Sequence, residues 1–327
     1  MHPYNNESVV WINDKLSLKY TLGEDFKDIM PDYYLYIEND GEYTYLQDAP
    51  ECIAKDEFFI YNLLKEKKTL IIKPNSSKSG GEGVMKVEWQ DLMQSTDNQQ
   101  YCWGGVRINN KETITVESFQ NRIKNLGNNI VTEYAFQHPQ LKRIWPDSEC
   151  TLRIVMVKMP NDNFFEEAKW NCISSFARFG TSMSGGTSNL SAGGIGVGFD
   201  FQTGQLNPRG SRYLQFCSDN QDRYCYEHPD THVLWKNEVL PNWNYVKDTL
   251  IKVCSHYSRL SHLGFDVIIT EKGFVLCEIN SKPETLVSQM ECFPLLLTQE
   301  NKAYYKSKGL DKIVKSDFYS IYKNCQE

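Results

Sequence analysis

The stretch that decides the fold reads GFDVIITEKGFVLCEIN and runs from Gly264 to Asn280. Two short apolar runs flank residues 271–273, and a three-residue loop that ends in glycine is typical of a β-hairpin. If Thr270 pairs with Phe274 across this loop, the register of both strands is fixed. The stretch therefore predicts two paired antiparallel strands.

This register places two carboxylates and an amide on one face of the hairpin. Asp266 lies opposite Glu278, and Asn280 shares the face of Glu278 because side chains alternate along a strand. Like charges placed directly opposite each other destabilise a sheet, and a hard cation would offset that cost. Oxygen ligands of this kind favour Mg²⁺. The alternative is a hairpin end with solvated acids.

Composition limits the classes of protein that remain. The chain has 327 residues, a charged fraction of 24% and a net charge of −7, which predict a folded protein without a broad basic surface for nucleic acid. Its ten cysteines form no metal-binding array and indicate free thiols in a reducing compartment. We find no signal peptide and no apolar run long enough to span a membrane, so we expect a cytoplasmic protein without membrane insertion.

Strand-like and helix-like segments mix along the chain without strict alternation. The strand-like segments are 33–37, 69–73, 129–133, 151–158, 173–179, 194–199, 266–270 and 274–279. The helix-like segments are 56–65, 116–126 and 246–262. Residues 205–244 indicate a long ordered insertion. This mixture favours an α+β architecture over a doubly wound parallel sheet.

A lysine and a small-residue loop follow the second strand-like segment. Lys73 ends that apolar strand, and residues 75–83 are rich in serine and glycine. Glycines let backbone N–H groups approach an anion, and a lysine supplies a point charge for a phosphate. The alternative is a flexible hairpin loop.

The segment 130–139 leaves a buried strand and ends in a proline. Backbone groups at such an exit can bind an adenine edge, and Glu133 and Gln137 can reach an amino group or ribose hydroxyls. An ordinary exit from strand to loop is the alternative, and it is favoured for this segment by itself.

Arg153 and Arg178 each lie among apolar residues on predicted strands. An unpaired guanidinium is costly there, and arginine binds phosphate or carboxylate bidentately. A structural ion pair with one of the many acids is the alternative.

Residues 180–196 form a dense glycine and serine run between two predicted strands. Such a loop could cover or position a substrate, or it could be a mobile surface loop. Outside it, His138 and His228 each precede a proline and are interpreted as loop histidines with satisfied hydrogen bonds.

Taken in order, these motifs resemble the ATP-grasp superfamily, and within it the sugar-transfer-associated ATP-grasp proteins. The resemblance covers about residues 10–285. It rests on Lys73-Pro74 with its glycine loop, the segment from Glu133 to Pro139, Thr151–Arg153, Arg178, Asn189–Gly194, His228-Pro229, Gly264–Asp266 and Glu278–Asn280.

The resemblance implies an α+β ATP-grasp fold in which two α+β lobes sandwich the nucleotide. Residues 1–68 would lead into the core, residues 69–135 would form the small nucleotide-binding lobe, and residues 136–327 would form the large lobe with the metal and substrate site. Too few residues precede Lys15 to build the separate domain of many relatives. Substrate recognition would then come from the insertion, the glycine/serine loop or a partner.

The resemblance also implies roles for individual residues. The catalytic set would be Arg153, Arg178, Lys73 and Asn189. The ATP-binding set would be Lys15, Lys73, Ser79, Gly80, Gly81, Gly83, Glu133, Tyr134, Ala135 and Gln137. The magnesium ligands would be Asp266, Glu278 and Asn280.

The activity implied is that of an ATP- and Mg²⁺-dependent carboxylate–amine ligase that works through an acyl-phosphate and releases ADP and phosphate. Its substrates would be a small-molecule carboxylate and an amine, such as a sugar acid, amino acid or peptide, in surface glycan or small-molecule biosynthesis. A small-molecule kinase and a non-catalytic ATP-binding protein are the alternatives. A homodimer or a partner protein remains possible.

Overall fold

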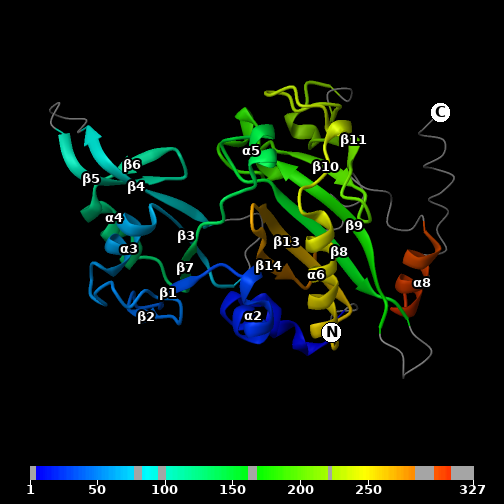
Figure 1. The fold of residues 1–327 in the computed structure, drawn as a ribbon, viewed down its shortest axis with the longest axis horizontal. Coiled ribbons are helices and arrows are strands. Elements are labelled where there is room, and N and C mark those ends of the chain that lie inside the picture. The colour runs from blue at the N-terminus through cyan, green and yellow to red at the C-terminus, as the bar shows by residue number, and fades with distance from the viewer. Residues whose placement is uncertain are drawn as a thin grey trace. The chain divides into compact units, whose positions relative to one another are not determined.

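The computed structural model describes residues 5–76, 83–94, 101–160, 168–219, 223–283 and 298–310. The chain divides into two compact units (Figure 1). The small unit comprises Asp14–Leu16 and Met30–Phe136. The large unit comprises Met1–Asn13, Ser17–Ile29 and Gln137–Glu327.

The small unit is built on an antiparallel sheet in the order β2-β1-β7-β3-β4-β5-β6. Its strands are β1 (Tyr33–Ile37), β2 (Tyr43–Tyr45), β3 (Thr69–Pro74), β4 (Met85–Gln94), β5 (Tyr101–Ile108), β6 (Glu112–Ile114) and β7 (Asn129–Glu133). Helices α3 (Phe59–Lys67) and α4 (Val116–Lys124) accompany it.

Both helices cover the same face of this sheet. Leu63 of α3 and Phe119 of α4 share a buried core with Leu70, Ile72 and Val131 of the central strands. Alternation then places the odd-numbered residues of β3, and with them Lys73, on the face away from these helices. Burial of the apolar face is what holds the helices to the sheet.

The large unit contains a second antiparallel sheet, in the order β12-β11-β10-β9-β8-β13-β14. Its strands are β8 (Thr151–Lys158), β9 (Trp170–Phe179), β10 (Ile195–Phe199), β11 (Leu206–Ser211), β12 (Tyr224–Cys225), β13 (His262–Thr270) and β14 (Gly273–Asn280). The helices of the unit are α1 (Val10–Asn13), α2 (Lys15–Leu22, which begins in the small unit), α5 (Pro139–Ile144), α6 (Trp243–His256) and α8 (Gln299–Ser307). Short 3₁₀ turns are η1 (Glu7–Val9), η2 (Glu24–Ile29), η4 (Ser182–Ser184), η5 (Leu190–Ala192), η6 (Leu214–Phe216) and η8 (Trp235–Asn237).

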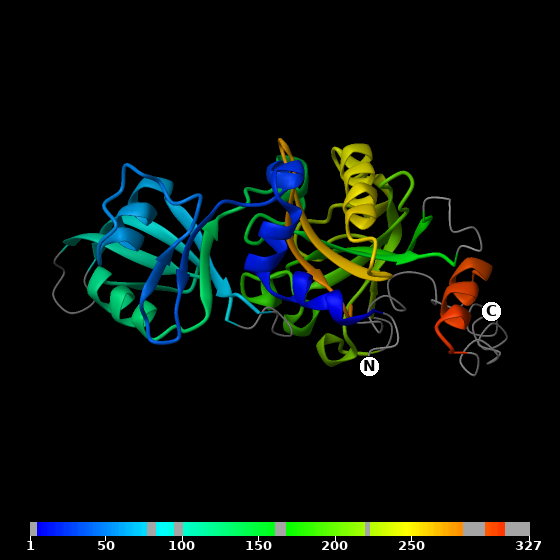
Figure 2. The same cartoon turned by 90° about the horizontal axis from the view of Figure 1, so that it is seen from below.

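Helix α6 lies along one face of this sheet (Figures 1 and 2). Trp243 packs edge to face on Phe199 of β10, and Tyr245 packs in the same way on Phe274 of β14. Both phenylalanines belong to the same sheet face, because Phe274 pairs with Ile269 and Phe199 shares the face of the buried Val197. The opposite face, which α6 leaves uncovered, carries the polar residues of the hairpin.

The hairpin differs from the prediction at its turn. Thr270 pairs with Gly273, so the loop has two residues instead of three, and the predicted pair of Thr270 with Phe274 is wrong. A β-bulge at Cys277 adds one residue to β14, since Val267 pairs with Leu276 while Asp266 pairs with Glu278. The bulge restores the register, and the predicted opposition of Asp266 and Glu278 is confirmed.

The α+β class is confirmed, and several element bounds agree with the sequence-based expectations. β1, β7 and β8 begin and end where the apolar runs begin and end. The predicted helix 246–262 is wrong at its end, because α6 stops at His256 and His262 already begins β13. Within the described residues, no helix is both long and apolar enough to cross a bilayer.

Candidate active site

Two rows of residues bring the predicted hairpin acids and arginines of the large unit onto one sheet face. In the first row, Arg153 of β8 pairs with Asp266 of β13, which pairs with Glu278 of β14. In the second row, Thr151 of β8 pairs with Arg178 of β9. Thr151 and Arg153 share a face by alternation, so the cluster assembles residues from four strands of the sheet.

Asp266 is the centre of this cluster. Arg153 donates to it with two nitrogens, Nε to Oδ1 and Nη2 to Oδ2, the second bond being 2.9 Å long. The Nη2 atom of Arg178 lies 3.2 Å from Oδ1. All three side chains are mostly buried, with exposed fractions of 12% for Arg153, 15% for Arg178 and 8% for Asp266.

The charge state of Asp266 follows from these contacts. Burial by itself raises the pKa of its carboxyl group, but the two guanidinium groups and their hydrogen bonds outweigh burial and hold the pKa well below its usual range. Asp266 is therefore ionised at neutral pH. Two carboxylates and two guanidinium groups make the cluster of Asp266, Glu278, Arg153 and Arg178 formally neutral.

The arginines change one step of the sequence argument. Repulsion between Asp266 and Glu278 does not by itself require a cation, because the guanidinium groups already compensate Asp266. The structural ion pair considered for Arg153 and Arg178 is present. Their proposed catalytic role is an additional claim.

The remaining oxygens of the cluster still suit a hard cation. The Nδ2 atom of Asn280 donates to Oε1 of Glu278 at 3.0 Å, which holds the two side chains together. Carboxylate and amide oxygens are ligands that Mg²⁺ accepts. Among the described residues, no group of three or more His, Cys, Asp or Glu side chains is arranged to hold a metal, so a cation here would rely on Asn280 and on oxygens from ligand and water.

The glycine/serine loop is ordered by its own hydrogen bonds. Thr181 accepts from Met183 through its side chain, donates to the carbonyl of Gly193 at 2.9 Å, and exchanges bonds with Ser184. The backbone carbonyl of Asn189 accepts from the N–H of Gly194 at 3.0 Å. The loop is therefore closed at its base, unlike a mobile surface loop.

His228 supports this loop from the insertion. It is fully buried, and its Nε2 atom lies 2.8 Å from the carbonyl oxygen of Gly180, while Nδ1 accepts from the N–H of Asp230 and of Thr231. Burial lowers the pKa of His228 more than the bond to Gly180 raises it. His228 is thus a neutral histidine with satisfied hydrogen bonds, as the sequence predicts.

Gln137 lies at the start of the large unit and is buried. Its Oε1 atom accepts from the backbone N–H of Cys150, just before β8 begins. The side chain therefore fixes the approach of the chain to Thr151 and Arg153. Its role toward a ribose stays a prediction.

The two predicted phosphate lysines lie in the small unit, and both are buried. The Nζ atom of Lys15 donates to the carbonyl oxygen of Pro74 at 3.0 Å, directly after Lys73. The Nζ atom of Lys73 lies 5.8 Å from the centre of the Tyr33 ring. Asn75 joins the two segments further, since its Oδ1 accepts from the N–H of Leu16. The structure therefore brings Lys15 and Lys73 to the same end of β3.

The predicted adenine segment shows a division between the two faces of β7. Glu133 pairs with Leu70 and is exposed, so it belongs to the helix-covered face, opposite to that of Lys73. Tyr134 is buried, and Ala135 is partly buried. The Nζ atom of Lys86 lies 4.7 Å from the centre of the Tyr134 ring. Lys86 was missed from sequence; its pairing with Ile71 across β3 and β4 places it on the face of Lys73.

The glycine loop after Lys73 is described only at its end. Ser79, Gly80 and Gly81 lie outside the described residues. Gly83 has φ +81°, and a Cβ atom there would lie 3.0 Å from Cγ of Pro74. Glycine is therefore required at this position by both conformation and space.

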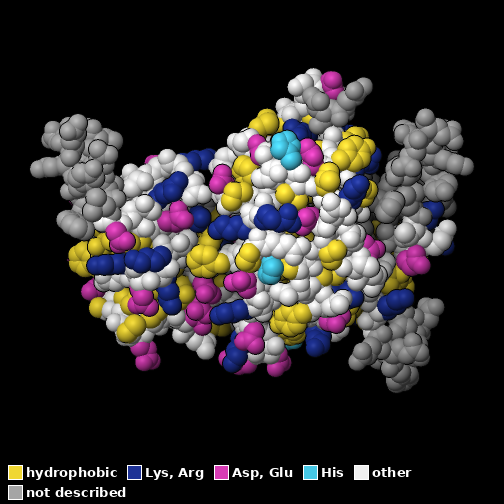
Figure 3. All heavy atoms as spheres, turned by 45° about the horizontal axis from the view of Figure 1, so that its top comes forward, with side chains coloured by type: hydrophobic (Ala, Val, Ile, Leu, Met, Phe, Trp, Pro, Cys, Tyr) yellow, Lys and Arg dark blue, Asp and Glu magenta, His cyan; other side chains and the backbone are white. Residues whose placement is uncertain are grey.

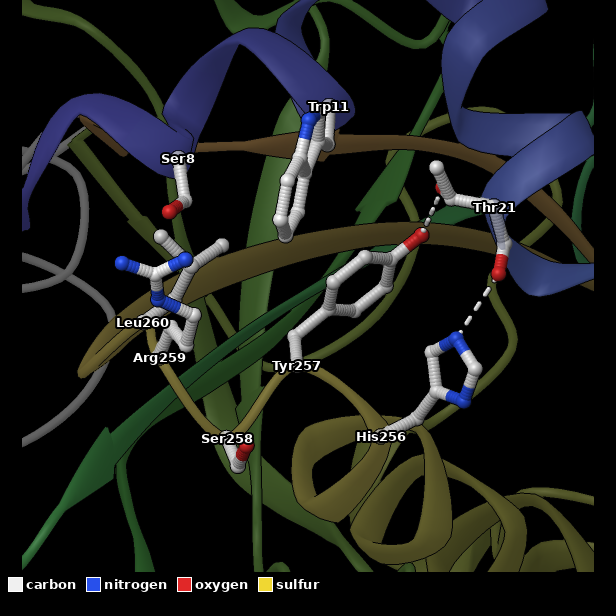
Figure 4. Close-up of a pocket in the computed structure, with 8 residues that line it drawn as sticks. All are labelled: Ser8, Trp11, Thr21, His256, Tyr257, Ser258, Arg259 and Leu260. Carbon is white, nitrogen blue, oxygen red and sulfur yellow. Dashed lines mark hydrogen bonds between the residues drawn. The ribbon is translucent and has the colours of Figure 1, made fainter.

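A separate cavity of about 300 Å³ lies in the large unit (Figure 4). Trp11, Tyr257 and His256 line it, and the hydroxyl groups of Tyr257 and Thr21 are 2.7 Å apart. None of the residues predicted from sequence lines this cavity. On the face in Figure 3, acidic and basic side chains are interspersed, in keeping with the net charge of −7.

Solved structures similar to this chain include D-alanyl-alanine synthetase A from Vibrio cholerae O1 biovar eltor str. N16961, with 11% identity over 95% of this chain and 67% of that chain and a TM-score of 0.46. The biotin carboxylase domain of the Hydrogenobacter thermophilus 2-oxoglutarate carboxylase, solved with MgADP and bicarbonate, has 10% identity over 93% of this chain and 46% of that chain, and a TM-score of 0.44. The ATP-grasp ligase PsnB in complex with a minimal precursor has 11% identity over 88% of this chain and 58% of that chain, and a TM-score of 0.40.

The chain spans about half the length of the first of these solved structures, with 48% of an N5-carboxyaminoimidazole ribonucleotide synthetase and 46% of the biotin carboxylase domain covered. No protein of curated function matches this chain significantly in sequence. The sequence model of one family matches residues 1–301, nearly the whole described chain. The protein therefore belongs to the sugar-transfer associated ATP-grasp family.

Proposed function

We propose that this protein is an ATP- and Mg²⁺-dependent carboxylate–amine ligase that works through an acyl-phosphate. Membership of the ATP-grasp family supports ATP-dependent ligation as the general activity. The observation that carries the finer proposal is the cluster in which Arg153 and Arg178 meet on the carboxylate of Asp266, beside Glu278 and Asn280. Two guanidinium groups on one buried face can stabilise a phosphoryl group and an acyl-phosphate.

The chemistry consists of two displacements. An oxygen of the substrate carboxylate attacks the γ-phosphorus of ATP, the bond from that phosphorus to the β-bridging oxygen breaks, and ADP leaves. The amine nitrogen then attacks the acyl carbon, the bond from this carbon to the phosphate oxygen breaks, and phosphate leaves while the nitrogen loses a proton. The phosphate carries away one oxygen of the original carboxylate.

The residues would divide this work by their chemistry. Lys15 and Lys73 would contact the phosphates of ATP, and backbone groups of Tyr134 and Ala135 would contact the adenine. Glu278 and Asn280, with Asp266, would hold the cation. Bound Mg²⁺ would neutralise charge on the phosphates. Arg153 and Arg178 would orient the transferred group, which is the main contribution of a protein to phosphoryl transfer.

Hydroxylamine trapping tests this function. The protein is incubated with ATP, Mg²⁺ and hydroxylamine against a panel of sugar acids, amino acids and small peptides. Metal-dependent ADP release with formation of a hydroxamate would support the ligase and identify the carboxylate. ADP release with a stable phosphoester would instead identify a kinase, and bound ATP without turnover on any acceptor would favour a non-catalytic role.

A further inference from the structure

The loop between β9 and β10, residues 180–194, is folded onto the face of the sheet that carries the arginines. Leu190 of this loop packs with Phe176 and Tyr213. Phe176 lies directly opposite Arg153 on the neighbouring strand, so it shares the face of Arg153. The loop therefore forms a wall beside the arginine cluster.

Ser188 extends this wall to the arginines. Its hydroxyl group lies 3.0 Å from the hydroxyl group of Thr151, and Ser188 is only 6% exposed. Thr151 pairs with Arg178 across β8 and β9. Paired residues of neighbouring strands have Cβ atoms about 4.5–5.5 Å apart, so the two hydroxyls stand next to the root of the Arg178 side chain.

The reach of Arg178 places its guanidinium above β8. Asp266 lies on β13, two strands from β9, and neighbouring strands are about 4.7–4.9 Å apart. Contact between Arg178 and Asp266 at 3.2 Å therefore requires the side chain to cross β8. Thr151 and Arg153 are the residues that β8 presents there, so the hydroxyl pair borders the guanidinium group.

The chemistry of this corner suits a carboxylate. Ser188 and Thr151 have two hydroxyl protons, and their mutual bond uses one, so one O–H remains for an acceptor. The guanidinium groups beside them are further donors, and the nearby carboxylate of Asp266 already accepts from both arginines. We propose that Ser188 and Thr151 bind the carboxylate group of the acid substrate, which makes the loop 180–194 the element that recognises the acid. This proposal rests on the proposed ligase function.

Substrate kinetics give the first test, using the acid that forms a hydroxamate. Ser188→Ala and Thr151→Val should raise KM for the acid by about tenfold, equivalent to about 1.4 kcal/mol, with KM for ATP little changed. Thr151→Ser, which keeps the hydroxyl, should restore most of the affinity. Ser182→Ala is the control on the same loop, because Ser182 is exposed and bonds Asp230 instead. Equal changes in both KM values, or no change, would overturn the proposal.

A second test needs no turnover and therefore stays readable if no acid gives a hydroxamate. The melting temperature of each protein is measured with malonate against chloride at equal ionic strength, since a ligand that binds the folded state raises it. We expect malonate to stabilise wild type and Ser182→Ala, and to lose this effect in Ser188→Ala and Thr151→Val. The same response in all four proteins, or none in wild type, would overturn the carboxylate site without bearing on the ligase chemistry.

Discussion

The Nη2 atom of Arg178 on β9 lies 3.2 Å from Oδ1 of Asp266 on β13, with strand β8 between them. Arg153 on β8 binds the same carboxylate with two nitrogens. One buried aspartate thus holds two arginines from two strands at a fixed position. This arrangement prepares both guanidinium groups before any substrate binds, which is how a site gains rate without reorganisation.

Replacement of either arginine should impair the chemical step. For Arg178→Ala and Arg153→Ala we expect turnover to fall by about 10²–10³, by analogy with the loss of one transition-state donor. The measurement is kcat for ADP release coupled to hydroxamate formation.

Arg143→Ala is the matched control for these arginines. Arg143 also pairs with a buried acid, Glu238, at 2.7 and 2.8 Å, but it lies on α5 outside the cluster. This variant should keep its turnover. Turnover unchanged in Arg178→Ala, or reduced equally in Arg143→Ala, would contradict the assigned role.

The hairpin acid Glu278 should set the requirement for magnesium. Glu278→Gln removes the charge of a proposed ligand while keeping its shape, so the half-saturating Mg²⁺ concentration should rise by about tenfold or more. Glu271→Gln serves as the control, since Glu271 is exposed at the turn of the same hairpin. Equal magnesium dependence in both variants would remove Glu278 from the metal site.

The cluster also makes stability depend on pH. The pKa of Asp266 is lowered in the folded state, so its contribution is full above the ordinary aspartate pKa of about 3.9 and is lost as the pH falls toward the folded pKa. Asp266→Asn leaves two arginines without their acceptor and should cost about 3–5 kcal/mol at neutral pH. Urea unfolding should show this difference narrowing below about pH 4. A difference that grows in acid would be inconsistent with this pairing.

His228 should act in a higher pH range. Burial lowers its pKa in the folded state, whereas the unfolded chain takes up a proton near pH 6.5. Stability should therefore fall as the pH drops below about 6.5. His228→Gln, whose amide can still donate to Gly180, should flatten this dependence in thermal melts between pH 7 and 5. Parallel melting curves for the two proteins would exclude His228 as the cause.

Local patterns predict the strands of this fold well where the sequence is strongly apolar. The run from Thr151 to Lys158 forms β8 with the predicted bounds, because it is rich in branched apolar residues. β4 and β5 (Met85–Gln94 and Tyr101–Ile108) were missed because polar residues interrupt them. The turn of the hairpin was misjudged because the bulge at Cys277 leaves no clear mark in the sequence.

The candidate site was only partly predictable. The opposition of Asp266 and Glu278 depends on one hairpin and follows from local register. The contact of Arg178 with Asp266 depends on the strand order β9-β8-β13, which joins strands far apart in the sequence. The bond between Ser188 and Thr151 depends on the path of a loop. Neither of these long-range contacts has a local sequence signal.

The most direct test of the acyl-phosphate is transfer of an oxygen atom. The acid found by hydroxylamine trapping is labelled with ¹⁸O in its carboxylate, and the released phosphate is analysed by ³¹P NMR after one turnover with ATP and the amine. Our account predicts that each phosphate formed carries one labelled oxygen, because the carboxylate attacks the γ-phosphorus. Phosphate free of label would contradict the ligase mechanism.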